Sequence, residues 1–366
     1  MSIASVDQLN GLVPLREETV RFDIHNAAGT KLGVLAVDSS ARARITNDTG
    51  RSIRRTLEGL RIPPRPLHDQ DTTRYYAAEI NALTQNVRPQ WILEPSGDAY
   101  PLGVFYFADA SSSSHTWGEP LDCSLVDRCV DLDQPLETTV GYPTGTLVHT
   151  ALVAEAIAAG ITDTTLIQAS SLVLGEPVAG AAGRDTRLRV MEQLCAKIGF
   201  LAPYFDNSGN FVCRAAEVVE TAIPKFDYGL NTNVIMGSIL QSDDSLSSPN
   251  RWIALDPAAV LAPLVGRFDL PAVAPNSFAN TARRRTRVVE IVGLADQAAA
   301  HAAAQAAYAT SGATFSWLSF QTPADPRHDT FDIIDFNDVH YREIAWSLDL
   351  AAGGLHRHDC RGTYNS

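Results

Sequence analysis

The sequence has very little lysine and is acidic overall. Lys31, Lys197 and Lys225 are the only lysines among 29 basic residues, and 42 acidic residues give the chain a net charge of −13. A surface that binds along duplex DNA needs clustered cations that neutralise phosphates. The composition therefore argues against a protein that binds duplex DNA along its surface.

Cysteine is also scarce, and its placement argues against two kinds of site. The sequence has 5 cysteines, an odd number, and no two of them form a CxxC pair. Disulfide frameworks and zinc fingers are recognised by paired spacings that are missing here. We therefore expect buried free thiols at Cys123, Cys129, Cys195, Cys213 and Cys360.

Long apolar runs and known catalytic motifs are missing as well. No run reaches the roughly 18 apolar residues of a transmembrane helix, and the first residues lack the basic and then apolar pattern of a signal peptide. The motifs GxxxxGK, HExxH and GxSxG do not occur, and His149 stands alone on a predicted helix. We expect a soluble protein, made in the cytoplasm, that is not an enzyme and binds no cofactor.

One histidine pattern has the composition of a metal site. His356, His358 and Cys360 alternate along the last predicted strand, so their side chains share one face of it. Three ligands without a fourth partner leave a tetrahedral zinc site incomplete. The sequence therefore favours a polar strand face at these positions, and we expect no metal.

A second pattern is acidic. Asp329, Asp332 and Asp335 follow His328 at intervals of three, which on a strand would place neighbours on opposite faces. Solvated strand edges are the favoured interpretation. The turn at residues 206–210, DNSGN, is similar to a calcium loop but lacks the closing glutamate, so a hairpin turn is favoured there.

The stretch Arg184–Arg214 is the most regular part of the chain. Apolar residues recur at steps of three and four over Leu188–Ile198, which predicts a helix that Gly199 ends in a left-handed cap. Strands Phe200–Phe205 and Phe211–Ala215 are expected to follow as a hairpin. The unit is a packing element with no reactive group.

Short strands with turn residues between them dominate the two flanking regions. The string Tyr100–Phe107 is one example, and a strand at Arg283–Val292 and an alanine-rich helix at Gln297–Tyr308 belong to the later region. Ser170–Val178 is a further candidate strand, and Pro257–Pro275 is expected to be a surface excursion. We predict domains at residues 1–125, 126–235 and 236–366, the middle one being α/β.

Arginines gather in one run. Arg283, Arg285 and Arg287 alternate along the strand predicted there, on one side of an otherwise acidic protein. They are candidates for a subunit contact, because guanidinium groups pair well with carboxylates at interfaces. A solvated edge that discourages aggregation between sheets is the equally weighted alternative.

Several of these segments resemble phage tail hub proteins, the minor tail proteins of long-tailed phages and the baseplate hubs of contractile tails. The resemblance rests on the helix and hairpin of residues 184–214, on YPLGVFYF at 100–107, on SLSSPNRWIAL at 245–255, and on the order of the C-terminal elements. It implies a β-rich α+β fold, with two β-barrel-like domains joined by an α/β part.

The resemblance also implies a role. Such proteins form a ring-shaped homotrimer that closes the distal end of the tail tube and adapts its sixfold symmetry to a threefold tip. Expected partners are the distal tail protein, the tape measure protein and tail-tip or fibre proteins, with DNA only passing through the channel. The expected location is the virion, at the distal tail tip, after synthesis in the cytoplasm of the host bacterium.

Two alternatives come from other classes of protein. One is the N-terminal scaffold part of a tail-associated peptidoglycan hydrolase, which would need a further domain after the last strand. The other is a host-receptor or carbohydrate-binding tail module, which a shallow groove lined by Trp and Tyr would favour. The tryptophans are scattered along the sequence at Trp91, Trp117, Trp252, Trp317 and Trp346.

Overall fold

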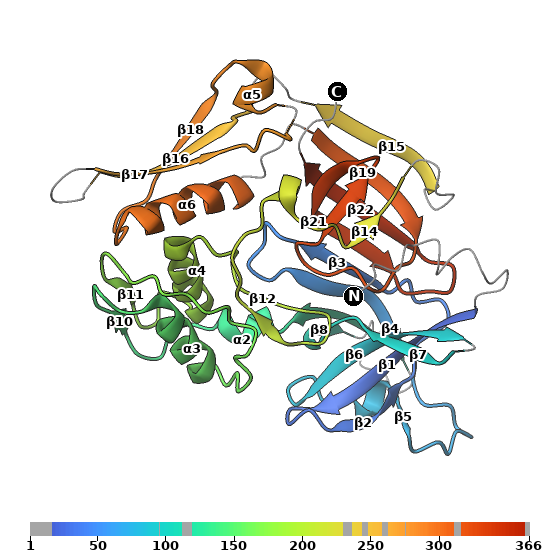
Figure 1. Cartoon of the computed structure of the whole chain (residues 1–366). Helices are drawn as coiled ribbons and strands as arrows, with labels where there is room; N and C mark the ends of the chain where they lie inside the picture. Colours follow the sequence, from blue (N-terminus) through green and yellow to red (C-terminus); the bar gives the residue numbers. More distant parts are fainter. Residues whose placement is uncertain are drawn as a thin grey trace.

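The chain has a β-rich α+β fold, as its sequence predicts. A computed structural model describes residues 17–94, 96–111, 119–229, 236–243, 248–257, 263–274, 276–310 and 316–362. Two β-rich regions flank a region of short strands and helices, and Figure 1 shows this middle region beside both of them. No helix among the described residues is long and apolar enough to cross a membrane.

The first region is almost entirely strands. Apolar residues alternate in most of them, so that one face of each strand enters the core, as in β4, where the buried residues include Leu57, Leu60 and Ile62. Its elements are β1 (Glu17–Asn26), β2 (Lys31–Leu35), β3 (Arg44–Asp48), β4 (Arg55–Ile62), β5 (Arg74–Tyr75), η1 (Ala77–Glu79), β6 (Gln85–Glu94), β7 (Asp98–Pro101), β8 (Phe105–Ser111) and β9 (Leu121–Asp127).

The middle region is organised by helix α4 (Arg187–Ile198), which confirms the predicted helix. The Thr186 hydroxyl accepts the Arg189 backbone N–H at its start, and Gly199 ends it with a φ of 75°. The other elements are α2 (Cys129–Leu132), β10 (Val140–Tyr142), α3 (Val148–Ala158), β11 (Val178–Gly180), β12 (Tyr204–Phe205), β13 (Phe211–Val212), η2 (Val219–Thr221) and β14 (Phe226–Asp227).

The last region contains strands and two helices. Helix α6 confirms the predicted alanine-rich helix and extends it by two residues. The elements are β15 (Met236–Asp243), β16 (Arg251–Asp256), β17 (Leu264–Asp269), α5 (Phe278–Thr281), β18 (Thr286–Glu290), α6 (Gln297–Thr310), β19 (Ser316–Pro323), β20 (Ile333–Phe336), β21 (Val339–Asp349) and β22 (Leu355–Gly362).

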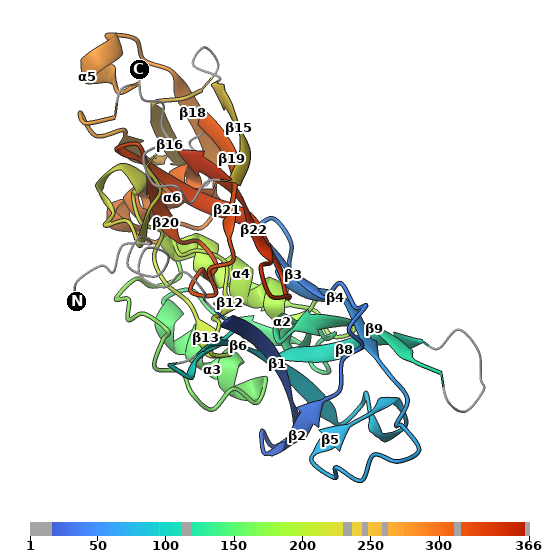
Figure 2. The ribbon, with the colours of Figure 1, turned by 90° about the vertical axis from the view of Figure 1, so that its right-hand side faces the viewer.

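Strands of the two β-rich regions join into one sheet. Its order is β15-β19-β22-β21-β3-β4-β9-β8-β6-β1-β2-β5, and Figure 2 shows these strands following one another along the long dimension of the molecule. The join is the antiparallel pair β21–β3, where Trp346 lies opposite Asn47. Trp346 and Leu348 consequently enter the same apolar core as Leu57 and Trp91 of the first region.

A separate small sheet, β17-β16-β18, packs on helix α6. The contact is close, because a Cβ added to Gly266 of β17 would collide with the backbone oxygen of Ala300. Helix α6 in turn packs on α4, and Gly199 lies against the backbone of Ala302. Glycine and alanine therefore allow a sheet and two helices to stack with short separations.

Several predicted elements differ from the observed ones. The hairpin after α4 is present, but Pro203 has no N–H to donate to a ladder, and only Phe200 and Ala215 pair before β12 and β13 begin. Of the strand predicted over Ser170–Val178, only an isolated pair at Val173 and the first residue of β11, Val178, are present, and Gly175 between them lies against the backbone of Leu294 and Ala295. The segment predicted as a surface excursion contains strand β17.

The apolar cores do not follow the predicted domain limits, which remain a proposal. One core combines Leu201 and Tyr204 with Trp252 and Tyr308, from both sides of residue 235. The five cysteines are free and buried, as expected.

Candidate interaction surface

The arginine run lies where the chain enters the edge strand β18. Helix α5 ends at Thr281, Ala282 takes a left-handed φ of 53°, and strand β18 begins only at Thr286. The predicted strand over Arg283–Val292 therefore starts too early, because a capped helical turn precedes it, and the observed strand also ends two residues before Val292. Of the three candidate residues, only Arg287 lies in the strand.

Asn250 holds the backbone of this run in place. Its side chain donates to the Arg283 carbonyl at 2.8 Å and accepts the Arg285 N–H at 2.9 Å, and its own N–H donates to the Arg285 carbonyl at 2.8 Å. Asn250 is buried, so these bonds are shielded from water. The amide fixes residues 283–285 at the start of β18.

The three candidate side chains have different surroundings. Arg285 is half-buried and donates to the side chain of Asn276 at 3.4 Å. Arg283 and Arg287 are exposed, and within the described part of the chain neither forms an ion pair. The neighbouring Arg284 stacks over the ring of Phe278 at 4.5 Å. Two unpaired cations therefore face solvent at a sheet edge of an acidic protein.

Arg287 also borders a groove between the small sheet and the helices. The groove has a volume of about 410 Å³ and mostly apolar walls. Val289 and Ile291 continue the face of β18 that carries Arg287, and Ala303, Ala306 and Ala307 of α6 oppose them. The cation lies at the border of an apolar depression, a composition found at protein interfaces.

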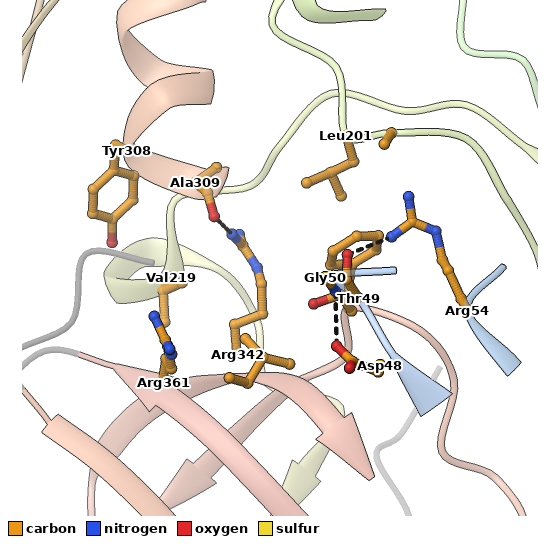
Figure 3. Close-up of a pocket in the computed structure, with 13 residues that line it drawn as sticks. Asp48, Thr49, Gly50, Arg54, Leu201, Val219, Tyr308, Ala309, Arg342 and Arg361 are labelled. Atoms are coloured by element: carbon orange, nitrogen blue, oxygen red, sulfur yellow. Dashed lines mark hydrogen bonds between the residues drawn. The ribbon is translucent and has the colours of Figure 1, made fainter. Parts of the chain in front are cut away.

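A cavity of about 290 Å³ lies where the three regions meet, and we call it the junction cavity (Figure 3). It is lined by residues of the β3–β4 turn, of the linker after α4, of the end of α6 and of β21. The lining residues are Asp48, Thr49, Gly50, Arg54, Leu201, Ala202, Val219, Tyr308, Ala309, Phe331, Arg342, Ile344 and Arg361.

Two buried arginines of the junction cavity bind backbone carbonyls. Arg54 donates to the Thr49 oxygen at 2.9 Å, and Arg342 donates to the Ala309 oxygen at 2.8 Å, as the dashed lines of Figure 3 show. Arg342 also donates to the Glu217 oxygen, and burial lowers its pKa. Arg54 also donates to the Pro203 carbonyl at 3.4 Å, so Arg54 connects the first region, and Arg342 the last region, to the middle region.

A buried group of polar side chains lies apart from this surface. It consists of His356 and His358 on β22, Glu343 on β21 and His328 in the loop before β20, and we call it the histidine cluster. Their ligand-type atoms all lie within 4.8 Å of one another, and all four side chains are buried. The sequence placed two of these residues on one face correctly.

The strand face with His356 and His358 is buried, however, because β21, β19 and the loop cover it. Cys360 is buried on β22 but is not part of the cluster. A register shift between Glu343 and Ala345 in β21 allows both Glu343 and Trp346 to point inward. Sequence reasoning missed Glu343 and His328, since no local pattern shows which strand and loop face β22.

The interpretation of the acidic series as solvated strand edges is wrong for Asp332, whereas Asp329 and Asp335 are partly exposed. Asp332 is buried. Its carboxylate accepts a hydrogen bond from the Lys225 ammonium at 3.0 Å and another from the Asp329 backbone N–H at 2.6 Å. Burial raises the pKa of Asp332 to about 7, against the attraction of Lys225. Only Asp335 lies in a strand, β20.

The tryptophans do not line a groove within the described residues. Trp91, Trp252 and Trp346 are core side chains, Trp317 is half-buried, and Trp117 lies outside the described residues. This arrangement gives no support to a carbohydrate-binding module, whose aromatic side chains would have to face solvent.

No family model matches the sequence, and no curated protein matches it. Solved structures do match over nearly the whole chain. A tail protein from Neisseria meningitidis MC58 has a TM-score of 0.58 and 11% identity, covering 94% of this chain and 96% of that one. A 43 kDa tail protein of prophage MuSo2 from Shewanella oneidensis has a TM-score of 0.57 and 13% identity, covering 94% and 98%.

A third match is a prophage tail protein from Listeria monocytogenes EGD-e. It has a TM-score of 0.54 and 10% identity and covers 93% of this chain and 94% of that one. At such identities the likeness concerns the fold, and it extends over all three regions. The predicted resemblance is thereby confirmed, and this chain has the fold of phage tail proteins.

Proposed function

We propose that the chain is a structural virion protein, a tail hub that closes the distal end of a phage tail tube and adapts the sixfold tube to a threefold tip. The observation that carries this proposal is the match to three tail proteins, each covered over at least 94% of its own length. A fold shared over the whole length of the chain favours a shared structural role. Likeness in a single domain of otherwise different proteins would be weaker support.

The charge of the chain fits a part that lines a DNA channel. A ring of three chains would carry three times the net charge of −13. Like charge prevents DNA from sticking to a wall that it must pass. The same charge repels the subunits from one another, so a ring needs apolar burial and local charge pairing to form.

The arginine run is the proposed source of that pairing. Arg283 and Arg287 are exposed, and we assign them to a contact with an acidic surface of a second subunit or of the tube end. Arg285 belongs to the same contact region, and its bond to Asn276 supports the loop. The remaining proposed partners are the distal tail protein, the tape measure protein, and tip or fibre proteins.

Light scattering coupled to size-exclusion chromatography tests the ring. We expect a mass of three times the 39.5 kDa chain, at protein concentrations that differ a hundredfold. A monomer at every concentration, with or without added tube-end protein, would contradict the trimer.

Two further measurements test the location and the absence of catalysis. Gold-labelled antibodies against the chain should decorate virions at the distal end of the tail. Zymography on cell walls of a susceptible host should give no lysis band. Label on the capsid, or a clear lysis band, would contradict the proposed role.

A further inference from the structure

The histidine cluster offers four side-chain ligands in one buried place. Three imidazoles and one carboxylate are a donor set that first-row divalent metal ions accept. Four protein ligands with no access to water are the arrangement of a closed, structural zinc site. We propose that the histidine cluster binds one divalent transition-metal ion, with Zn²⁺ as the first candidate.

His356 is the observation that separates this cluster from an ordinary buried hydrogen-bond network. Its side chain is completely buried, and within the described residues its ring nitrogens form no hydrogen bond of normal geometry, although the Asp325 backbone lies close enough to influence its pKa. Its ring lies 4.1 Å from that of His358 and 4.7 Å from that of His328, centre to centre. A polar group buried without a partner is strongly unfavourable, and a metal ion between the rings would supply the missing partner.

The other two histidines are oriented from outside the cluster. The Tyr228 hydroxyl lies 2.7 Å from His328 Nε2, and the Thr322 hydroxyl lies 3.0 Å from His358 Nε2. Both rings therefore turn Nδ1 inward, toward Glu343, at 2.8 Å and 2.6 Å respectively. Outer hydrogen bonds that fix the tautomer and direct the free nitrogen inward are typical of metal-binding histidines.

One arrangement of the protons around His358 leaves a place for a cation beside Glu343. In this arrangement the Thr322 hydroxyl donates to the Pro323 carbonyl at 2.9 Å and accepts from His358, whose Nε2 then carries a proton. In neutral His358, Nδ1 then has only a lone pair, and it faces a carboxylate oxygen of Glu343. Either a proton or a metal ion must lie between these two atoms.

A proton alone satisfies only part of the cluster. Placed on Glu343, it could be donated to His358, while His328 donates from Nδ1 to the other carboxylate oxygen. His356 would remain without a partner. A metal ion would bind Glu343 and all three histidines together.

The cluster also has a structural position that a metal ion would reinforce. Strands β21 and β22 supply three ligands, and the loop between β19 and β20 supplies His328. The next residue of that loop, Asp329, forms an ion pair with Arg55 of the first β-rich region. A bound ion would therefore fix the position of this loop, which contacts the first β-rich region through the ion pair of Asp329 with Arg55.

Metal analysis of the full chain without a histidine tag is the direct test. We expect about one zinc per chain after purification, or after incubation with Zn²⁺ and removal of the excess. Removing the metal with a chelator should lower the melting temperature by several degrees, and Zn²⁺ but not Mg²⁺ should restore it. Co²⁺ should give the visible absorption of a four-coordinate site.

Variants separate a metal site from a polar core. His356→Leu should lose at least tenfold in zinc affinity, and its melting temperature should no longer respond to Zn²⁺. His149→Leu, which changes a histidine on α3 outside the cluster, should bind zinc as the wild type does. A wild type that takes up less than a tenth of an equivalent of Zn²⁺ or Co²⁺, with a His356→Leu variant of higher melting temperature, would overturn the proposal.

A second substitution covers the case in which His356→Leu does not fold. His356→Cys keeps a metal-binding atom at the position. With Co²⁺ it should show a thiolate-to-cobalt charge-transfer band in the near ultraviolet, which requires a bond from the new sulfur to the metal. Absence of that band in folded, cobalt-treated His356→Cys would count against the site.

Discussion

Arg55 on β4 forms an ion pair with Asp329, which lies 274 residues later in the chain. The Arg55 side chain is 1% exposed, and its guanidinium also donates to the Asn207 side chain at 2.6 Å and to the Thr330 hydroxyl at 3.0 Å. One arginine thus connects the first β-rich region, the hairpin after α4 and the loop before β20. Its bonds join three regions of the fold at a buried point.

Removing this guanidinium should therefore destabilise the whole chain. Arg55→Met keeps most of the side-chain volume but leaves Asp329 without its cation and Asn207 without its donor. Breaking a buried ion pair on one side typically costs about 3–5 kcal/mol. We expect a loss of that size in the free energy of unfolding, measured by urea denaturation.

The pair Arg44–Asp349 is the matched control. It also joins the first and last regions, but its side chains are 53% and 36% exposed. Exposed ion pairs contribute about 0–1 kcal/mol, so Arg44→Met should change the stability little. Equal losses for the two variants would show that burial does not distinguish the pairs.

Leu194 tests the core around α4. It is completely buried among apolar side chains, and Leu194→Asp would place a carboxylate there without a partner. The cost is several kcal/mol, a large share of the stability of an ordinary domain. We expect insoluble protein or a greatly lowered melting temperature. Ala196→Asp, two residues later at an exposed position, should remain soluble and fold normally.

Gly266 tests the contact of the small sheet with α6. Any side chain there would meet the Ala300 carbonyl, so Gly266→Ala should lower the stability by about 1–3 kcal/mol. Gly141 in strand β10 has open space where a Cβ would lie, with no atom within 4 Å, and Gly141→Ala should be close to neutral. Thermal unfolding of the two variants side by side measures the difference, and equal values would contradict the close packing.

The arginine run makes a prediction about assembly. The double variant Arg283→Ser, Arg287→Ser removes two exposed cations and should leave the melting temperature of the monomer unchanged. Contact with a second subunit or the tube end should weaken, and more so at low salt, because exposed charges interact over about a Debye length. Light scattering at several salt concentrations measures this. Unchanged assembly at every salt concentration would identify the run as a solvated edge.

Asp332 predicts a pH dependence of stability. Burial raises its pKa to about 7 in the folded chain, well above the ordinary value of an unfolded aspartate. The folded state therefore binds more protons between these two pKa values. Its stabilising contribution is complete below about pH 4 and is lost as the pH rises through about 7.

The measurement is a comparison with Asp332→Asn, which keeps the shape but cannot ionise. From pH 5 to pH 8 the wild type should lose on the order of 3 kcal/mol relative to the variant. Denaturant titrations in metal-free buffer give the free energy of unfolding of the wild type and of the variant at each pH. If the free energy of unfolding of the two proteins changed with pH in parallel, Asp332 would not titrate in this range.

Local patterns in the sequence determined the parts of the fold that depend on neighbouring residues. The periodicity of Leu188–Ile198 and the capping preference of Gly199 act over a few residues, so helix α4 could be predicted to within one residue. The buried thiols and the alanine-rich helix follow from local composition in the same way. Over most of Ser170–Val178, where Gly175 lies against the distant residues Leu294 and Ala295, the local pattern gave the wrong element.

Contacts between distant residues were decided only by the tertiary structure. Alternation along β22 placed His356 and His358 on one face, but nothing nearby in the sequence shows that Glu343 and His328 complete the cluster. The pairing of β21 with β3, the ion pair of Arg55 and the burial of Asp332 arise in the same way. A strand pattern specifies which side chains share a face, whereas the partner of that face is set by chain segments that meet only when the whole molecule folds.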